Sequence, residues 1–424
     1  MKILLLNLIP TPHKEFYSGF HQGLAILGAY IKKANNRYQY ISIHKDNINS
    51  LNETLKSFEP DLILTYTCSL QVELLKEISL IIKNFNKNIL LIAGGPHATV
   101  APENTIAIQG VDAICIGEGE LALENILDYM AKKKELSGIK SLWIKKDNFI
   151  EKNPLNPLIE NLDTVPFPER DIMNFEEIKN TPWFSIMGME VLTSRGCPFQ
   201  CTYCINASLQ KIYPKNAPYY RRRSVQNVIE ELEFLKKHFS FVSLFGFHDD
   251  TFILQKSWLK KFLDIYKSKI NLPFWCNARV DEIDSQTIKN LKKAGCIRIH
   301  MGVESGNYLI RKNILNRNIT DEQIIQAFKL AKDHGIKTVA FNMLGVPEDT
   351  EETVLETISL NKKIKPTWSI TSCFMPLPGT KYFSEKTAVE NMQNTYYTPS
   401  EQNNLSHVSS EKLEYYVKNF HRLI

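Results

Sequence analysis

Short apolar runs alternate with amphipathic stretches along the first 135 residues of the chain. Runs with the length and composition of buried strands occur at residues 2–8, 38–43, 61–66, 88–93 and 112–116. Between them, apolar residues recur at helical spacing at 19–33, 70–84 and 120–132. Strands that alternate with helices in this way form right-handed βαβ units around a parallel sheet. Residues 1–135 are therefore predicted to form a doubly wound, flavodoxin-like α/β domain, which binds ligands at the carboxyl ends of its strands.

Residues 136–185 have a different pattern. Two short runs at 141–146 and 148–152 flank Asp147 and predict a small hairpin. Closely spaced prolines follow, including one on each side of Phe167. Proline fixes φ, lacks an amide donor and restricts the residue before it, so this stretch is predicted to be an extended linker.

A second series of strands and helices occupies residues 186–385. Strands are predicted at 190–193, 241–246, 274–277, 297–301, 338–343 and 369–375. The helices between them include 225–238, 257–268, 285–294, 321–334 and 351–362. Six βα repeats predict a partial (β/α) barrel of the TIM type, with chemistry at the carboxyl-end loops. Residues 386–424 are predicted to be a polar tail that ends in a packing helix at 410–423.

Composition narrows the class of protein. The 424 residues exceed one typical domain, and 43% hydrophobic residues suffice for packed cores. A formal net charge of +5 is too small to indicate a nucleic-acid-binding protein. The apolar start ends at Asn7, which is too early for a signal peptide, and no apolar run reaches the roughly 20 residues of a membrane span. Eight cysteines without a secretion signal indicate reduced thiols and a cytoplasmic location.

Candidate chemistry is concentrated in the run Cys197-Pro-Phe-Gln-Cys201-Thr-Tyr-Cys204. Three thiolates at this spacing can surround one point, and three thiolates on a 4Fe-4S cluster leave one iron open to a small molecule. A tetrahedral zinc site would require a fourth Cys or His, and none lies within about 30 residues on either side. A redox pair of Cys201 and Cys204 leaves Cys197 unexplained. A zinc site and uninvolved cysteines remain alternatives to the cluster.

This motif follows a predicted strand and has Tyr203 directly before its third cysteine, and it resembles the signature of the radical S-adenosylmethionine (radical SAM) superfamily. The resemblance implies that Cys197, Cys201 and Cys204 bind three irons of a 4Fe-4S cluster. It also implies that S-adenosylmethionine (SAM) chelates the fourth iron and is cleaved to methionine and a 5′-deoxyadenosyl radical. The resemblance extends over residues 1–385.

Polar motifs at later strand ends resemble the SAM-binding elements of this superfamily. Asp249 and Asp250 follow the second barrel strand, where paired carboxylates can accept hydrogen bonds from an ammonium group or cap a helix. Arg279 follows the third strand and can bind a carboxylate or form a surface ion pair. Glu304 follows the fourth strand, and one carboxylate can accept from both ribose hydroxyls.

The resemblance also implies a SAM contact at Tyr203, and two smaller features complete the predicted SAM site. Ser305 belongs with Glu304 to a Gly-x-Glu-Ser-Gly element, which resembles the ribose-binding element of the superfamily. Gly345 begins a segment after the fifth strand that resembles the one near adenine, although a glycine there can simply make a turn.

Glycine loops follow the last two strands of the first predicted domain. They read Gly94-Gly95-Pro96-His97-Ala98-Thr99 and Gly117-Glu118-Gly119-Glu120. Glycine lets the backbone approach a bulky ligand, although each loop alone is an ordinary turn. Together they resemble the cobalamin-binding domain that precedes many radical SAM barrels, which implies cobalamin contacts at Gly94, Gly95, His97, Thr99, Gly117 and Glu118. No histidine lies in an Asp-x-His-x-x-Gly motif, so the axial ligand is unassigned, and His97 can instead bond only to its own loop.

The sequence therefore predicts a cobalamin-dependent radical SAM enzyme, in the first place a methyltransferase at an unactivated carbon. Alternatives are ring closure or rearrangement, an N-terminal domain that no longer binds cobalamin, and a zinc-binding scaffold without enzyme activity. The expected partners are a small-molecule substrate, such as a biosynthetic intermediate, and a reductant such as flavodoxin or ferredoxin. No nucleic acid and no membrane span are expected.

Overall fold

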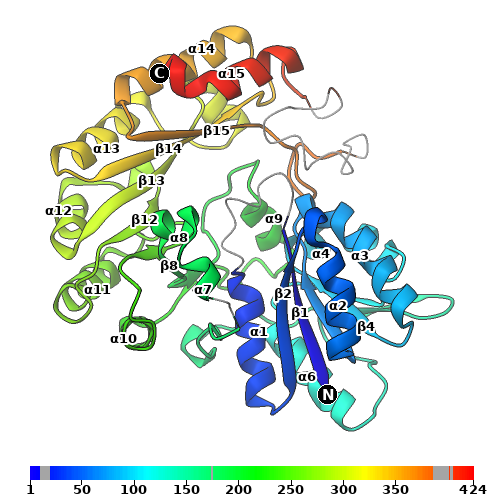
Figure 1. Ribbon diagram of the computed structural model, residues 1–424. Coiled ribbons are helices and arrows are strands. Elements are labelled where there is room, and N and C mark those ends of the chain that lie inside the picture. Colours follow the sequence, from blue (N-terminus) through cyan, green and yellow to red (C-terminus); the bar gives the residue numbers. More distant parts are fainter. Residues whose placement is uncertain (10–19, 173–174, 385–400, 402–403) are drawn as a thin grey trace. The chain divides into compact units, whose positions relative to one another are not determined.

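The computed structural model describes residues 1–9, 20–172, 175–384, 401 and 404–424 (Figure 1). The chain forms two compact units, and neither is one continuous segment. The first unit comprises Met1–Glu160, Thr164–Trp183 and Ser208–Pro218. The second comprises Asn161–Asp163, Phe184–Ala207 and Tyr219–Ile424. The first unit thus continues beyond residue 135 and includes the hairpin that was expected to begin the linker.

The first unit contains a seven-stranded sheet in the order β2-β1-β3-β4-β5-β6-β7. Its strands are β1 (Lys2–Leu8), β2 (Arg37–Ile43), β3 (Leu62–Tyr66), β4 (Leu90–Gly94), β5 (Ala113–Cys115), β6 (Leu142–Lys145) and β7 (Ile150–Lys152). The first five are parallel, and β6 and β7 continue the sheet antiparallel. The order 2-1-3-4-5 is the flavodoxin-like topology, with its switch point between β1 and β3. The predicted fold class of this domain is confirmed.

Longer amphipathic helices and two short helices that begin with proline connect these strands. They are α1 (Gln22–Lys33), α2 (Asn49–Phe58), α3 (Val72–Phe85), α4 (Pro96–Val100), α5 (Pro102–Ala107) and α6 (Glu120–Ala131). The amphipathic α1 and α6 contribute Ile31 and Ile126 to a core with Ile3 and Leu5 of β1. The short α4 and α5 each have proline in the first turn, where its missing amide costs nothing.

The second unit contains a six-stranded sheet in the order β15-β14-β13-β12-β11-β8, with all neighbours parallel. Its strands are β8 (Met189–Val191), β11 (Phe245–Phe247), β12 (Phe274–Ala278), β13 (Cys296–Glu304), β14 (Lys337–Leu344) and β15 (Trp368–Cys373). Between them run α10 (Val225–His238), α11 (Lys256–Lys269), α12 (Ser285–Ala294), α13 (Asp321–Asp333) and α14 (Glu351–Ile364). Sequential parallel strands with helices on the outside (Figure 1) form the predicted partial barrel, which is confirmed.

Alternate residues of the barrel strands separate an outer from an inner face. On the outer face, Phe247 of β11 stacks on Phe252, with 4.5 Å between ring centroids, and meets Phe262 of α11 edge to face. On the inner face, a Cβ atom at Gly246 would overlap the indole of Trp275. On the outer face the helix α11 therefore packs against aromatic rings of the strand. On the inner face the absence of a side chain at Gly246 leaves room for the indole of Trp275.

Several smaller elements lie outside the two large sheets. They are α7 (Phe175–Ile178), α8 (Pro182–Met187), β9 (Ser194–Arg195), α9 (Ile205–Lys211), β10 (Arg221–Arg222) and α15 (Ser410–Leu423). The strands β9 and β10 form a separate antiparallel ribbon that the sequence did not predict. The predicted terminal helix is α15, whose Leu413 and Val417 are buried with Leu344 of β14. No helix in the described parts of the chain is long and apolar enough to cross a membrane.

Candidate active site

The three motif cysteines lie on one loop of the second unit, between β9 and α9. All three are free thiols, and Cys201 is buried while Cys197 and Cys204 are partly exposed. The amide of Cys204 donates to the carbonyl of Cys201 at 3.1 Å, which turns the loop tightly. The loop begins at Gly196, whose φ is 78° and where a Cβ atom would overlap the Tyr219 carbonyl. Only glycine fits this turn, so the backbone fixes where the thiols start.

Three free thiols on one loop are the donor set that a 4Fe-4S cluster with one open iron takes. Burial raises the pKa of Cys197 and raises that of Cys204 to about 12, and the charge of Asp250 adds to both shifts. Thiols in this state bind metal as thiolates with release of protons. Among the residues that the structure describes, no group of three His, Cys, Asp or Glu side chains converges as a single metal ion requires. A cluster that takes one thiolate on each of three irons does not need such convergence.

Arg279 follows β12 and lies against the cysteine loop. Its Nη1 donates to the sulfur of Cys201 at 3.6 Å, and its guanidinium lies 3.7 Å from the ring centroid of Phe199. Its other nitrogens donate to both oxygens of Asp281, at 3.0 and 2.8 Å. The planar fork is therefore already paired with a carboxylate of the chain, and it brings a positive charge to the cysteine loop.

The two adjacent aspartates after β11 have different surroundings. Asp249 is fully buried, and its carboxylate accepts hydrogen bonds from the amide and hydroxyl of Thr193 and the hydroxyl of Ser194. Asp250 is exposed, although the protein around it removes enough water to raise its pKa. The charge of Asp250 adds to the pKa shifts of Cys197 and Cys204, so Asp250 is the member of the pair whose charge reaches the cysteine loop.

Glu304 ends β13 in a strained conformation beside the same loop. Its φ of 70° is rare for a residue with a side chain and often marks a functional position. The side chain folds back over Gly302, where a Cβ atom would overlap the carboxylate. Tyr203 donates its hydroxyl to Glu304 Oε1 at 3.1 Å, and Arg317 Nη1 lies 3.8 Å from the same oxygen. Burial raises the pKa of Glu304, and the Arg317 charge and the Tyr203 hydrogen bond oppose this shift.

Ser305 and Gly345 lie in turns that hydrogen bonds and packing stabilise. Ser305 is fully buried, and its hydroxyl accepts from the amide of Asn307 at 3.2 Å. The amide of Gly345 donates to Asp349 Oδ2 at 3.0 Å, and burial raises the pKa of Asp349 to about 6. A Cβ atom at Gly345 would lie 2.7 Å from Leu413, so the terminal helix supports this turn.

In the first unit, the loop after β4 lies over the end of β3. Gly95 has a φ of 98°, and a Cβ atom there would lie 2.9 Å from the backbone of Thr67. His97 is buried, and its Nδ1 is 3.0 Å from the hydroxyl of Ser69. Burial lowers the pKa of His97 to about 4, so the imidazole is neutral. His97 thus links the ends of two strands through a side chain as well as through its loop.

Thr99 and the loop after β5 complete this edge of the sheet. Thr99 Oγ1 donates to the Gly95 carbonyl at 2.8 Å and accepts from the Gly117 amide at 3.0 Å. Glu118 accepts from the Ile159 amide at 3.0 Å. The hydroxyl of Thr67 is fully buried and has no hydrogen-bond partner among the described residues. An unpaired buried hydroxyl beside glycine loops fits a bulky polar ligand at the carboxyl ends of β3, β4 and β5.

Two family models match separate parts of the chain. The Radical SAM superfamily matches residues 191–360, and the B12 binding domain matches residues 17–127. An uncharacterized methyltransferase of Pyrococcus horikoshii is 31% identical over 396 residues, which are 90% of this chain and 83% of that protein. The chain belongs to the radical SAM superfamily. It is a radical SAM enzyme with an N-terminal B12-binding domain.

Other relatives of this radical SAM enzyme carry different names. The anaerobic magnesium-protoporphyrin IX monomethyl ester cyclase of Rubrivivax gelatinosus is 26% identical over 342 residues, which are 78% of this chain and 60% of the cyclase. Among solved structures, the methyltransferase TsrM of Kitasatospora setae, with cobalamin and a [4Fe-4S] cluster bound, has a TM-score of 0.72 at 17% identity, covering 89% of this chain and 76% of TsrM. Because the identity is only 17%, this similarity shows that the chain and TsrM share a fold, and no more.

Sequence reasoning missed several residues of these sites. Arg317 lies within reach of Tyr203 and Glu304, but nothing near it in the sequence marks it as part of a site. Thr193 and Ser194 occupy the oxygens of Asp249. Their position at the end of the predicted strand 190–193, shortly before the cysteine motif, was the available signal.

Proposed function

We propose that this radical SAM enzyme is a cobalamin-dependent methyltransferase that acts on an unactivated carbon of a small molecule. The observation that carries the proposal is the loop of three free thiols with Asp250, Arg279 and Glu304 around it. The match to the B12 binding domain and the relative named as a methyltransferase support the second cofactor and the reaction.

In this proposal Cys197, Cys201 and Cys204 hold a 4Fe-4S cluster through three of its irons. When bound, the cluster and SAM would supply one-electron chemistry for hydrogen abstraction, and a corrinoid would supply methyl transfer. Arg279 donates a charge-assisted hydrogen bond to the sulfur of Cys201. The ion pair between the Arg279 guanidinium and the Asp281 carboxylate fixes the orientation of this donor.

The carboxylates divide the remaining tasks. Asp250 accepts a hydrogen bond from the SAM ammonium group, since Asp249 has its oxygens occupied by Thr193 and Ser194. Asp249 instead fixes the strand end before the cysteine loop. Glu304 accepts from the ribose hydroxyls, and the turn at Gly345 packs near the adenine.

In the first unit, the loops at Gly94, Gly95, Gly117 and Glu118 hold the corrinoid at the carboxyl edge of the sheet. Thr67 can supply a hydrogen bond that the protein leaves unmade. His97 and Thr99 position these loops, because both are bonded to neighbouring strand ends. The electron donor in this proposal is a small redox protein such as flavodoxin or ferredoxin in a reducing cytoplasm, and no nucleic acid takes part.

The test is anaerobic reconstitution with iron and sulfide, followed by product analysis with SAM and a reductant. Wild-type protein is expected to contain labile sulfide and to form 5′-deoxyadenosine, and Cys201→Ser is expected to lose both. Cys296→Ser is the matched control, because Cys296 is a buried thiol of the same unit whose bond to the Arg298 carbonyl a serine can keep. Zinc without sulfide in the wild-type protein would refute the proposal.

The relative named as a cyclase favours a second candidate, ring closure on the same two domains. S-adenosylhomocysteine together with 5′-deoxyadenosine indicates methyl transfer. 5′-Deoxyadenosine with a product of unchanged carbon count indicates ring closure or rearrangement.

A further inference from the structure

Residues 310–319 follow the turn that carries Glu304 and contact the cysteine loop through space. The segment begins with a π-helical turn, η6 (Ile310–Ile314), a form that is rare and frequent at functional sites. It lies within the second unit. No function proposed above uses its side chains, although it contacts both halves of the candidate SAM site.

The middle of the segment is hydrogen-bonded to the backbone between the cysteines. Thr202 donates its hydroxyl to the Ile314 carbonyl at 2.6 Å and its amide to the Leu315 carbonyl at 3.2 Å. The side-chain amide of Asn316 donates to the Gln200 carbonyl at 2.7 Å. The segment therefore fixes the cysteine loop on both sides of Cys201.

Arg317 joins this loop to Glu304. It is buried, with 5% of its surface exposed. Its Nη1 donates to the Tyr203 hydroxyl at 3.2 Å and lies 3.8 Å from Glu304 Oε1, while Nη2 donates to the Gly302 carbonyl at 2.8 Å. One guanidinium thus contacts the loop residue before the last cysteine and both the carboxylate and the backbone of the Glu304 turn.

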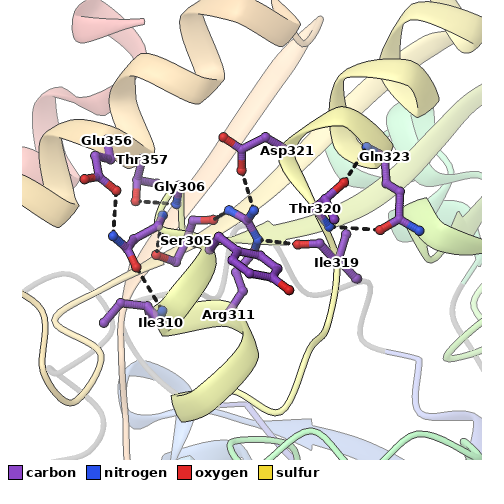
Figure 2. A network of polar contacts seen from close by, with 12 residues as sticks. Ser305, Gly306, Ile310, Arg311, Ile319, Thr320, Asp321, Gln323, Glu356 and Thr357 are labelled. Atoms are coloured by element: carbon purple, nitrogen blue, oxygen red, sulfur yellow. Dashed lines mark hydrogen bonds and ion pairs between the residues drawn. The ribbon is translucent and has the colours of Figure 1, made fainter.

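Arg311 holds the other side of the same turn (Figure 2). Its side chain is fully buried, and it donates to the Ser305 carbonyl at 2.7 Å and the Ile319 carbonyl at 3.0 Å. It also forms an ion pair with Asp321 at the start of α13. A buried guanidinium is stable only when its donors are satisfied, so these three acceptors fix the position of the Ser305 backbone.

The turn is further attached to α14 (Figure 2). The Gly306 amide donates to Thr357 Oγ1 at 2.8 Å, and Asn307 donates to Glu356 Oε2 at 2.8 Å. The side-chain oxygen of Asn307 accepts from the Ile310 amide at 2.9 Å, which ties the start of the segment to the same anchor.

We infer that residues 310–319 are a brace that sets the position of Glu304 relative to the cysteine loop, with Arg317 and Arg311 as positioning residues. The inference rests on the proposed function, in which one molecule of SAM meets the loop and Glu304 at the same time. A ligand held at two points binds well only if the points are correctly spaced, and both arginines fix that spacing. Neither arginine needs to touch SAM.

The experiment compares Arg317→Met, Arg317→Lys and Arg311→Met with Arg298→Met after anaerobic reconstitution. Arg298 is a matched control because it is also a buried arginine that donates to a backbone carbonyl, that of Ile186, but it lies at the opposite end of β13. The readouts are iron and sulfide content, the SAM dissociation constant, and the change that SAM causes in the EPR spectrum of the reduced cluster.

Arg317→Met and Arg311→Met are expected to weaken SAM binding about tenfold or more, which corresponds to about 1.4 kcal/mol, and to diminish the SAM-dependent EPR change. Arg317→Lys is expected to recover part of the affinity, because it keeps the charge beside Glu304. Arg298→Met is expected to keep the wild-type affinity even if its melting temperature falls as far.

Wild-type affinity and EPR response in Arg317→Met with a full cluster would overturn the inference. A loss in all variants, Arg298→Met included, in proportion to their loss of stability would also overturn it. If Arg317→Met does not fold, Tyr203→Phe replaces it in the test, because this variant removes only the hydroxyl that links Arg317 to Glu304. Wild-type SAM affinity in Tyr203→Phe would then overturn the inference. Wild-type protein that holds no cluster or shows no response to SAM would instead refute the proposed function.

Discussion

At the scale of single residues, neighbouring carboxylates do different work because their surroundings differ. Asp249 is surrounded by donors from Thr193 and Ser194, whereas Asp250 is exposed beside Cys197 and Cys204. The first therefore contributes to stability, and the second is available to a ligand. Substitution by asparagine changes charge without much change in volume and separates the two roles.

Asp249→Asn is expected to lower the free energy of unfolding by about 2–4 kcal/mol, because an amide group then faces the buried donors that the carboxylate accepted. Asp250→Asn is expected to unfold as the wild type does and to bind SAM more weakly. Urea unfolding and equilibrium dialysis measure the two effects. A loss of stability in Asp250→Asn, or a loss of SAM affinity without a loss of stability in Asp249→Asn, would contradict these two roles.

His97 makes stability depend on pH. Its pKa falls from 6.5 to about 4 on folding, because burial disfavours the charged imidazole. The unfolded chain therefore binds a proton more readily, so this stability is complete above pH 6.5 and is lost as pH falls toward 4. Wild-type protein is expected to lose about 2 kcal/mol more than His97→Gln between pH 7.5 and pH 5. Parallel pH profiles of the two proteins in urea unfolding would show that His97 does not titrate in this way.

At the scale of elements, the Glu304 turn and α14 approach so closely that only glycine fits between them. A Cβ atom at Gly306 would overlap the backbone of Glu356 and Thr357 in α14. The hydrogen bond from the Gly306 amide to Thr357 depends on this approach. The packing of one helix thus determines where the turn after β13 can lie.

Gly306→Ala is expected to destabilise the protein by about 1–3 kcal/mol, since helix or turn must move to admit the methyl group. It is also expected to weaken SAM binding, because the turn carries Glu304. Gly28→Ala in α1 is the control: its nearest neighbour would lie at 3.4 Å, and alanine favours a helix interior by about 1 kcal/mol. Thermal unfolding of both variants measures the difference, and equal stability would contradict the role of the close approach.

At the scale of the whole molecule, two units with separate cores carry two sets of loops at the carboxyl edges of parallel sheets. Each edge is a position where α/β sheets bind ligands. Cobalamin is therefore expected in the first unit and the cluster with SAM in the second, and each cofactor should stabilise the unit that binds it.

Hydrogen exchange measured by mass spectrometry can follow each unit separately. Cobalamin at about 100 times its dissociation constant is expected to stabilise the first unit against opening by about 2.7 kcal/mol, with slowed exchange at residues 67–69, 95–99 and 117–118. SAM added to the reconstituted protein is expected to slow exchange at 197–204 and 302–306. Unchanged exchange in the first unit at every cobalamin concentration would favour an N-terminal domain that no longer binds this cofactor.

Elements with strong local signals were predicted closely. The helices α10, α12 and α15 have the predicted bounds, because Ser224, Asp284 and Ser409 cap apolar patterns of helical spacing. The ribbon of β9 and β10 was missed, since two-residue strands have no periodicity to read. The short α4 lies where the sequence pattern predicts only a loop, because five residues are too few to show a helical period.

By itself the sequence determined the alternation of strands and helices, the two α/β units and the three thiols on one short loop. These follow from local spacing, which acts within a few residues. The tertiary structure decided which aspartate faces the cysteines, that His97 lies buried against Ser69, and that Arg317 reaches Tyr203, 114 residues away in the chain. Contacts of that kind depend on how strands and turns pack in space, and no local pattern encodes them.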